Sequence, residues 1–192
     1  MLLVALSVCW AVFIGVWALG ALYNARYAPA TIKRDSSIAV QPWQGWIVAA
    51  AAVVLLQAFV PSTLWTAITF KSDWLAAAGL VLLIGSTLFT LWARWTLGRM
   101  WSSVPALREH HELHTSGPYR FTRHPIYTGI LGMLLGSALG TGFGGVLVIL
   151  LVFAGVFLVR IQREEKLMLQ TFGEQYVRYQ RRVPRLVPLL HI

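Results

Sequence analysis

The sequence has 192 residues, of which 57% are hydrophobic and only 12% are charged. An ordinary soluble domain carries about twice that share of charge, and here the apolar residues fall in long runs, which excludes a water-soluble fold. The net charge of +9 would indicate nucleic-acid binding in a soluble protein, but the arrangement of the basic residues described below gives it a different cause.

Three apolar segments in the first half of the chain are long enough to cross a bilayer as helices. They cover residues 2–23, 43–60 and 74–93, and a span needs about 20 residues. Tryptophans near their boundaries fit the membrane interface. The first segment is not preceded by a basic residue and is followed by Arg26, so a cleaved signal peptide is not favoured.

Two further apolar segments, residues 126–140 and 143–159, are separated only by Thr141 and Gly142. So short a break predicts two antiparallel helices in a tight hairpin. In the first of them, glycines recur every three or four residues and share one helix face: Gly129, Gly132, Gly136 and Gly140. This face allows either the close approach of another helix backbone or room for a cofactor.

The distribution of basic residues predicts the topology. With five spans, every Lys and Arg except Lys71 falls in segments on one side of the bilayer. The excess of positive charge on cytoplasmic segments then places the N-terminus outside and the C-terminus in the cytoplasm. We therefore expect an all-α polytopic membrane protein of about five transmembrane helices, with helices 1–3 in residues 1–93. The catalytic half would occupy residues 94–192 and form one integrated domain with the rest.

Polar and ionisable residues are dense in only two segments, 94–127 and 160–185, which flank the hairpin and should meet at its cytoplasmic end. The histidine cluster within the first segment does not predict a metal site. His110 and His114 are four residues apart, but Glu112 lies two residues after His110 rather than directly after it as in zinc hydrolases. We expect neither a metal nor a nucleic acid as a partner.

His124-Pro125 predicts a helix start, because proline disfavours helix in the residue before it and suits the first helical position. Arg123 and His124 would then lie at the positive end of a helix, which attracts carboxylate or phosphate. Glu164 and Glu165 follow the last span, and Glu164 can pair with Arg160 one helical turn earlier. The two glutamates fit either a solvated, ion-paired helix end or a cation-binding role.

Several motifs resemble the isoprenylcysteine carboxyl methyltransferase family, which is related to the phospholipid methyltransferases. The first group runs Leu97-Gly98-x-x-Trp101-Ser102, His111-x-Leu113 and Gly117-Pro118-Tyr119-Arg120-x-x-Arg123-His124-Pro125-x-Tyr127-x-Gly129. The second group runs Arg160-x-x-x-Glu164-Glu165-x-x-Leu and Phe172-Gly173-x-x-Tyr176-x-x-Tyr179-x-x-Arg182-Val183-Pro184. Part of this pattern, Arg-His-Pro-x-Tyr-x-Gly, is shared with some membrane sterol reductases. His114 departs from the family pattern, which usually has an aliphatic residue there.

The resemblance implies a helical membrane enzyme that uses S-adenosylmethionine. It implies a cofactor pocket between the loop before the fourth span and the helix after the fifth, lined by His111, Leu113, Tyr119, His124, Glu164 and Glu165. We add Arg123 and Tyr127 to the cofactor-binding residues, because Arg123 offers charge and Tyr127 offers stacking or cation–π contact. The predicted catalytic residues are Arg182, which matches a family arginine near the C-terminal end, and Glu165.

The predicted reaction is methyl transfer to a lipophilic acceptor, most readily the carboxylate of an isoprenylcysteine. Such a carboxylate is ionised at neutral pH and needs only an arginine to hold it. Three alternatives stay open. An amine or thiol acceptor, such as a phospholipid, would require a base such as His114 or His124. A nicotinamide-dependent lipid reductase and a non-catalytic membrane scaffold are alternatives of other classes.

Overall fold

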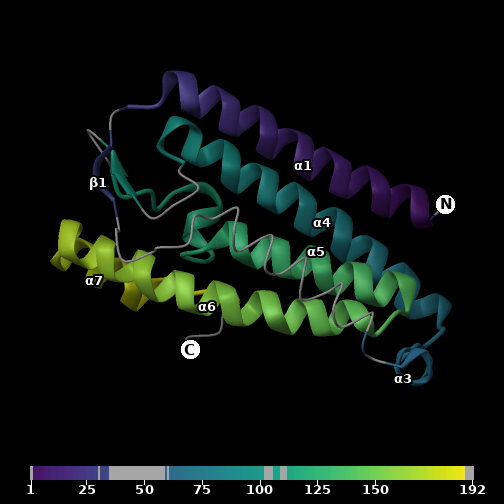
Figure 1. Cartoon of the computed structure of the whole chain (residues 1–192). Helices are drawn as coiled ribbons and strands as arrows, with labels where there is room; N and C mark the ends of the chain where they lie inside the picture. Colours follow the sequence, from purple (N-terminus) through teal and green to yellow (C-terminus); the bar gives the residue numbers. More distant parts are fainter. Residues whose placement is uncertain are drawn as a thin grey trace.

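The computed structural model describes residues 2–29, 31–34, 59, 61–101, 106–108 and 112–188. Four long helices dominate this part of the chain and lie side by side (Figure 1). They are α1 (Leu2–Tyr27), α4 (Asp73–Leu97), α5 (Pro125–Thr141) and α6 (Gly145–Phe172). Shorter elements cap the two ends of this bundle: α3 (Ser62–Ala67) at one end, and η1 (Gly98–Met100), η2 (Gly117–Arg120) and α7 (Glu174–Arg182) at the other.

The helical membrane fold predicted from the sequence is confirmed. Helices α1, α4 with η1, and α6 are long and apolar enough to cross a membrane, and α5 is a shorter apolar helix of 17 residues. Only 11% of the most apolar window of α1 is buried, so its large aliphatic side chains face outward, as lipid contact requires. The predicted span 43–60 lies outside the described residues apart from Phe59, and the count of five spans therefore stays a prediction.

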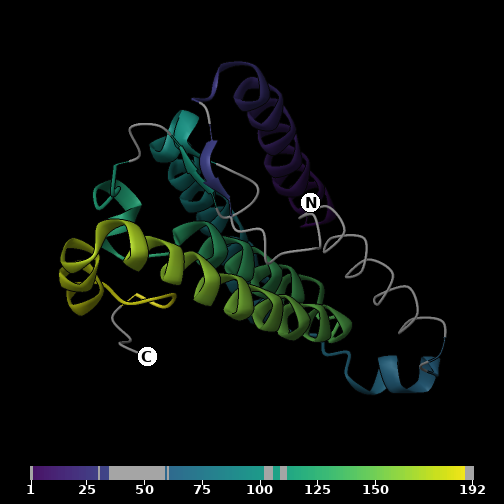
Figure 2. The same ribbon diagram turned by 60° about the vertical axis from the view of Figure 1, so that its left-hand side comes forward.

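Two features go beyond the sequence expectation. The last apolar span was expected to end near residue 159 with helical structure after it, and the structure joins both in α6, which continues without a break to Phe172. It ends where Gly173 adopts a positive φ of 47°, a conformation that favours glycine. In addition, strands β1 (Thr31–Arg34) and β2 (Ala106–Arg108) pair antiparallel. This two-stranded ribbon lies at the same end of the bundle as α7 (Figure 2).

The predicted hairpin between α5 and α6 is confirmed, and α5 begins at Pro125 as the sequence indicated. The turn depends on Gly142, which ends α5 in the left-handed region with φ 66°. This turn packs against the segment before α4, since the backbone N–H of Phe70 donates to the carbonyl of Gly142 over 2.8 Å. The hairpin end is thereby fixed at the end of the bundle opposite α7.

The glycine face of α5 packs against α4, which favours the packing interpretation over room for a cofactor. A Cβ on Gly136 would lie 2.6 Å from the backbone nitrogen of Leu83, and one on Gly129 would collide with the Thr90 side chain. On α4, a Cβ on Gly79 would lie 2.4 Å from the backbone nitrogen of Gly140. The backbones of α4 and α5 are therefore in direct contact, as small residues permit between membrane helices.

Candidate active site

The loop before α5 is held in place by the segment that follows α7. The backbone N–H of Arg123 donates to the carbonyl of Pro184 over 2.9 Å, and that of His124 donates to the carbonyl of Arg185 over 3.2 Å. The hydroxyl of Thr122 donates to the same Arg185 carbonyl over 2.8 Å, and Thr128 donates to Leu186 over 2.6 Å. The two polar segments predicted to meet therefore do so through backbone hydrogen bonds.

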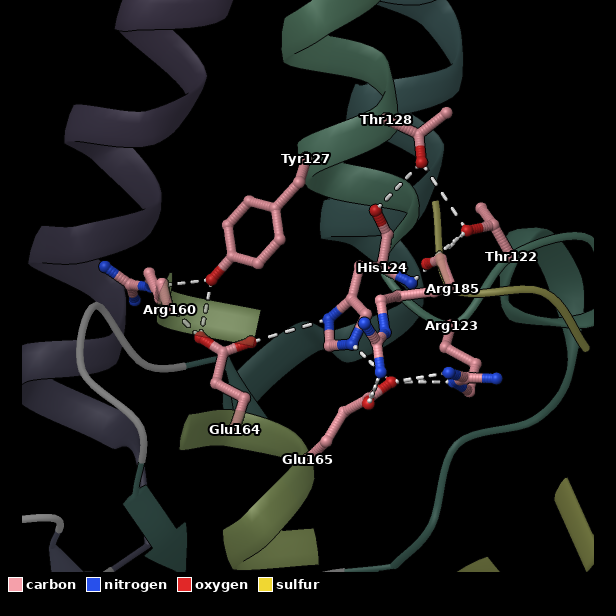
Figure 3. Close-up of polar contacts among 9 residues, drawn as sticks. All are labelled: Thr122, Arg123, His124, Tyr127, Thr128, Arg160, Glu164, Glu165 and Arg185. Carbon is pink, nitrogen blue, oxygen red and sulfur yellow. Dashed lines mark hydrogen bonds and ion pairs between the residues drawn. The ribbon is translucent and has the colours of Figure 1, made fainter. Parts of the chain in front are cut away.

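Glu165 of α6 is the centre of a buried charged cluster (Figure 3). One carboxylate oxygen accepts hydrogen bonds from Arg123 and lies 3.4 Å from Nε2 of His124. The other lies 3.1 Å from a terminal nitrogen of Arg185. The Arg123 and Glu165 side chains are only 7% and 6% exposed, so this pair is shielded from solvent and from screening by salt.

Glu164 carries a second set of contacts on the other side of His124. Its Oε1 accepts from the Tyr127 hydroxyl and from Nε of Arg160, the latter over 3.0 Å. The predicted Arg160–Glu164 pair one turn apart is thus confirmed. Its Oε2 lies 3.6 Å from Nδ1 of His124, a separation longer than a hydrogen bond. Glu164 therefore keeps an oxygen with free acceptor capacity.

Aromatic rings line the cluster on the bundle side. The Tyr127 ring stacks on His124 with centroids 5.7 Å apart and on Phe157 with centroids 4.7 Å apart. Its hydroxyl accepts a hydrogen bond from Arg160 over 2.6 Å while donating to Glu164. The Tyr127 side chain is therefore fixed at the border between the apolar core and the charged cluster.

The protonation of His124 is governed by its two acidic neighbours. Burial alone lowers the pKa of this imidazole, but the two glutamates beside its ring nitrogens outweigh burial through their negative charge and raise the pKa above its usual value. Figure 3 shows the imidazole between the two carboxylates, with Nδ1 toward Glu164 and Nε2 toward Glu165. The cluster as a whole then carries more positive than negative charge, with Arg123, Arg160 and Arg185 facing the same two glutamates.

Helix α7 and the segment before η2 form an aromatic wall beside the cluster. Tyr176, Tyr179 and Val183 are buried there, with Leu113 packed against them. The hydroxyl of Tyr179 donates to the carbonyl of the buried Tyr119 over 2.6 Å. Burial, more than any neighbouring charge, raises the pKa of Tyr119, which therefore stays protonated and neutral. Leu113 and Tyr119 thus belong to the same region as the charged cluster.

The structure gathers most of the predicted site residues and leaves Arg182 apart. Arg123, His124, Tyr127, Glu164 and Glu165 form the cluster itself. His111 lies outside the described residues. Arg182, at the end of α7, is exposed and forms no ion pair with any residue that the structure describes.

Sequence reasoning missed Arg185, which contacts Glu165 instead. In the sequence this arginine is one of four in a basic tail with nothing to distinguish it. The sequence feature that could have distinguished Arg185 is its position directly after Pro184. A proline at that position ends the helix, and the residues after it can then turn back toward the loop before α5.

The fold and this buried cluster define a helical membrane protein whose polar site is assembled at one end of its bundle. The family model described as phospholipid methyltransferase matches residues 74–175, and the chain belongs to this family. The matched region covers α4, α5 and α6 with the loops between them, whereas α1 and most of α7 lie outside it.

Curated relatives carry two kinds of name. Protein-S-isoprenylcysteine O-methyltransferase B of Arabidopsis thaliana is 34% identical over 122 residues, which cover 62% of this chain and 61% of that protein. The rat protein-S-isoprenylcysteine O-methyltransferase is 34% identical over 61% of this chain and 42% of its own length. The cobalt-zinc-cadmium resistance protein CzcN of Cupriavidus metallidurans is 33% identical over 50% of this chain and 45% of that protein. The chain thus spans less than two thirds of the length of these relatives.

A solved structure supports the fold. The eukaryotic intramembrane Ras methyltransferase ICMT superposes with a TM-score of 0.56 at 24% sequence identity, covering 83% of this chain and 55% of that chain. This similarity extends over more of the chain than the family model does. The resemblance stated from the motifs is therefore confirmed at the level of family and fold.

Proposed function

We propose that this protein transfers a methyl group from S-adenosylmethionine to the carboxylate of a lipophilic acceptor of the isoprenylcysteine type. The observation that carries the proposal is the convergence of residues 117–129 and 160–186 on one buried cluster. These are the segments whose motifs resemble isoprenylcysteine methyltransferases, and relatives with that name are 34% identical to this chain.

The donors and acceptors of the cluster fit the proposed cofactor. Oε2 of Glu164 retains acceptor capacity, and the side chain is 22% exposed, so it can accept from a hydroxyl or an ammonium group of a ligand. Tyr119 and Tyr127 offer aromatic surface to an adenine or a sulfonium. Glu165 is engaged by two arginines, so we assign it a positioning role, in which it orients Arg123 and His124.

S-adenosylmethionine, when bound, supplies an activated methyl group on a sulfonium. The protein's part is to align the acceptor with that methyl group and to exclude water, which are the main requirements of an in-line displacement. An ionised carboxylate attacks without a general base, and an arginine holds it by charge-assisted hydrogen bonds. The apolar outer surfaces of α1, α4 and α6 would let a lipid-linked acceptor approach from within the bilayer.

The location proposed for the site is the cytoplasmic side of the membrane, with the N-terminus outside. This follows from the charge distribution, because all basic residues except Lys71 lie on the side of the cluster if the chain has five spans. A reporter enzyme fused after Ile192 should be active only in the cytoplasm. Activity of a periplasmic or luminal reporter at that position would reverse the assignment.

The decisive experiment measures binding and turnover by the purified protein. We expect saturable binding of S-adenosylhomocysteine and no binding of a reduced nicotinamide dinucleotide. We also expect transfer of a radiolabelled methyl group to N-acetyl-S-farnesylcysteine. Nicotinamide binding without binding of the adenosyl ligand would indicate a lipid reductase, and binding of neither would indicate a scaffold.

A second candidate is methyl transfer to a phospholipid amine, which the description of the matched family favours. An amine acceptor must lose a proton, and His124 lies inside the cluster, but it would first have to give up the proton that Glu164 and Glu165 favour before it could act as the base. Phosphatidylethanolamine in mixed micelles is the test substrate. Methylation of this lipid, with no transfer to the cysteine derivative, would replace the carboxylate assignment.

A further inference from the structure

Two side chains in the seam between α1 and α4 bury polar atoms that have no hydrogen-bond partner within the described part of the chain. They are Oδ1 of Asn24 and Nε of Arg94, and each residue is only 6% exposed. The first atom is an acceptor and the second a donor. Buried polar atoms in folded proteins are nearly always paired, so an unpaired acceptor and donor in one seam call for an explanation.

The two side chains share a single backbone group. A terminal nitrogen of Arg94 donates to the carbonyl of Gly98 over 3.0 Å, and Nδ2 of Asn24 approaches the same oxygen at 3.4 Å. Asn24 also donates to the carbonyl of Trp101 over 2.7 Å, and the Arg94 guanidinium lies 4.4 Å from the centroid of the Trp101 ring. These contacts hold both side chains in place and leave Oδ1 and Nε unused.

The guanidinium of Arg94 packs against helix α1 at a glycine. A Cβ on Gly20 would lie 2.6 Å from a terminal nitrogen of Arg94, so Arg94 packs against the α1 backbone where a side chain is missing. Gly20 and Asn24 are one helical turn apart and lie on the same face. Arg123, Arg160 and Arg185 each face a glutamate, but within the described part of the chain no carboxylate pairs with Arg94.

This seam adjoins the candidate active site through η2. A Cβ on Gly117 would lie 3.2 Å from Oγ1 of Thr96, which places the start of η2 against the end of α4. Tyr119 follows two residues later in η2, and its carbonyl accepts a hydrogen bond from the Tyr179 hydroxyl of α7 over 2.6 Å. The η2 segment therefore connects the end of α4 with the aromatic wall beside the charged cluster.

We propose that Asn24 and Arg94 form a subsite for the amino-acid end of a ligand, in which a carboxylate lies next to an N–H donor. The carboxylate accepts hydrogen bonds from Arg94, and the neighbouring N–H donates to Oδ1 of Asn24. An unpaired arginine buried against a membrane helix is well explained by such a ligand. The subsite extends the site to α1, which lies outside the matched family region of residues 74–175.

This proposal rests on the proposed function, because both ligands of that reaction carry the required group. One source is the methionine end of S-adenosylmethionine, and the other is the carboxyl-terminal cysteine of the acceptor. If the acceptor binds here, Arg182 is left with contacts to lipid headgroups. If the cofactor binds here, Arg182 stays available for the acceptor carboxylate.

Two variants and a control test the subsite. Arg94→Gln removes the charge. Asn24→Asp keeps the size of the side chain and puts a carboxylate beside Arg94, where it repels a ligand carboxylate, although it also loses the hydrogen bond that Asn24 donates to Trp101. Gly15→Ala is the control, because a Cβ at Gly15 meets nothing within 4 Å. The readouts are calorimetric affinity for S-adenosylhomocysteine and thermal stabilisation by N-acetyl-S-farnesylcysteine.

We expect both variants to weaken binding of the same ligand by about tenfold or more, as the loss of a charge-assisted contact should, while the other ligand binds as to the control. The affected ligand identifies the source. If the unmodified protein binds both ligands and the Asn24→Asp protein binds them as the control does, the subsite is overturned. If the unmodified protein binds neither ligand, the proposed function fails and the subsite fails with it.

Discussion

Arg123 and Glu165 are 42 positions apart in the sequence, yet Nε and a terminal nitrogen of Arg123 both lie 2.8 Å from the same oxygen of Glu165. The remaining terminal nitrogen of Arg123 donates to the carbonyls of Gln180 and Val183, the last of which would otherwise be unsatisfied at the end of α7. One side chain thus joins the loop before α5 to α6 and to α7.

Glu165→Gln should destabilise the protein because it leaves Arg123 buried without its charge partner. Removing one member of a buried ion pair costs roughly 3–5 kcal/mol, so we expect a clearly lower midpoint of thermal unfolding in detergent. Glu112→Gln, at an exposed acidic position, is the matched control and should leave the midpoint unchanged. Equal midpoints for the two variants would show that the pair does not hold the loop and α7 together.

The raised pKa of His124 makes stability depend on pH. Because the folded-state pKa lies above the ordinary value of 6.5, the folded protein holds this proton more tightly than the unfolded chain does. The stabilisation is therefore complete below about pH 6.5 and is lost as the pH rises through the raised pKa. Thermal unfolding measured from pH 5.5 to pH 9 should show this decline, and His124→Gln should flatten it. An identical decline in the variant would assign it to another group.

The contact between α4 and α5 can be tested at glycines with opposite surroundings. Gly136→Ala places a Cβ 2.6 Å from a backbone nitrogen of α4, so the helices must separate, at a cost of roughly 1–3 kcal/mol. Gly85→Ala adds a Cβ that meets nothing within 4 Å and should stabilise α4 by about 0.5–1 kcal/mol. Thermal unfolding of both variants gives the sign of each change, and destabilisation by both would contradict the assigned packing.

The sequence predicted the fold wherever the physical signal is local. Uninterrupted apolar runs mark α1 and α4, and Pro125 marks the start of α5 to the residue. Hydropathy falls at Arg160 and so marks only the end of the apolar span, whereas the Arg160–Glu164 pair correctly predicted helix beyond that point. The β1–β2 ribbon pairs Thr31 with Arg108, and no local pattern reports a pairing over so long a separation.

The motifs name residues that the fold brings together, but they do not name the contacts between these residues. The motifs indicated His124 and the two glutamates, but only the fold shows that Glu165 contacts Arg185 rather than a residue of α7. Asn24 carried a signal that was not used, since an asparagine in an apolar helix indicates a polar partner. That partner, the backbone around Gly98 and Trp101, is over 70 residues away in the sequence and could not be read from it.

Arg182 remains the predicted clamp for the acceptor carboxylate, and its surroundings allow a sharp test. It is the last residue of α7, and Val183 after it is extended, with φ −122° and ψ 126°. Pro184 follows, and its carbonyl accepts a hydrogen bond from the backbone of Arg123. The backbone at Arg182 is therefore held in one position, whereas its side chain is exposed.

Replacing Arg182 by lysine distinguishes a residue that holds the acceptor carboxylate from one that only attracts anionic lipid headgroups. A charge that attracts headgroups survives Arg182→Lys almost intact, but a clamp with two parallel hydrogen bonds does not, because lysine lacks the planar fork of arginine. We expect Arg182→Lys to keep its expression level and its affinity for S-adenosylhomocysteine while losing most methyl transfer to N-acetyl-S-farnesylcysteine. Arg181→Lys, the exposed neighbour, should behave like the unmodified protein. If both variants turn over like the unmodified protein, Arg181 and Arg182 only contact lipid headgroups. The carboxylate of the acceptor then binds another residue, and Arg94 is the candidate.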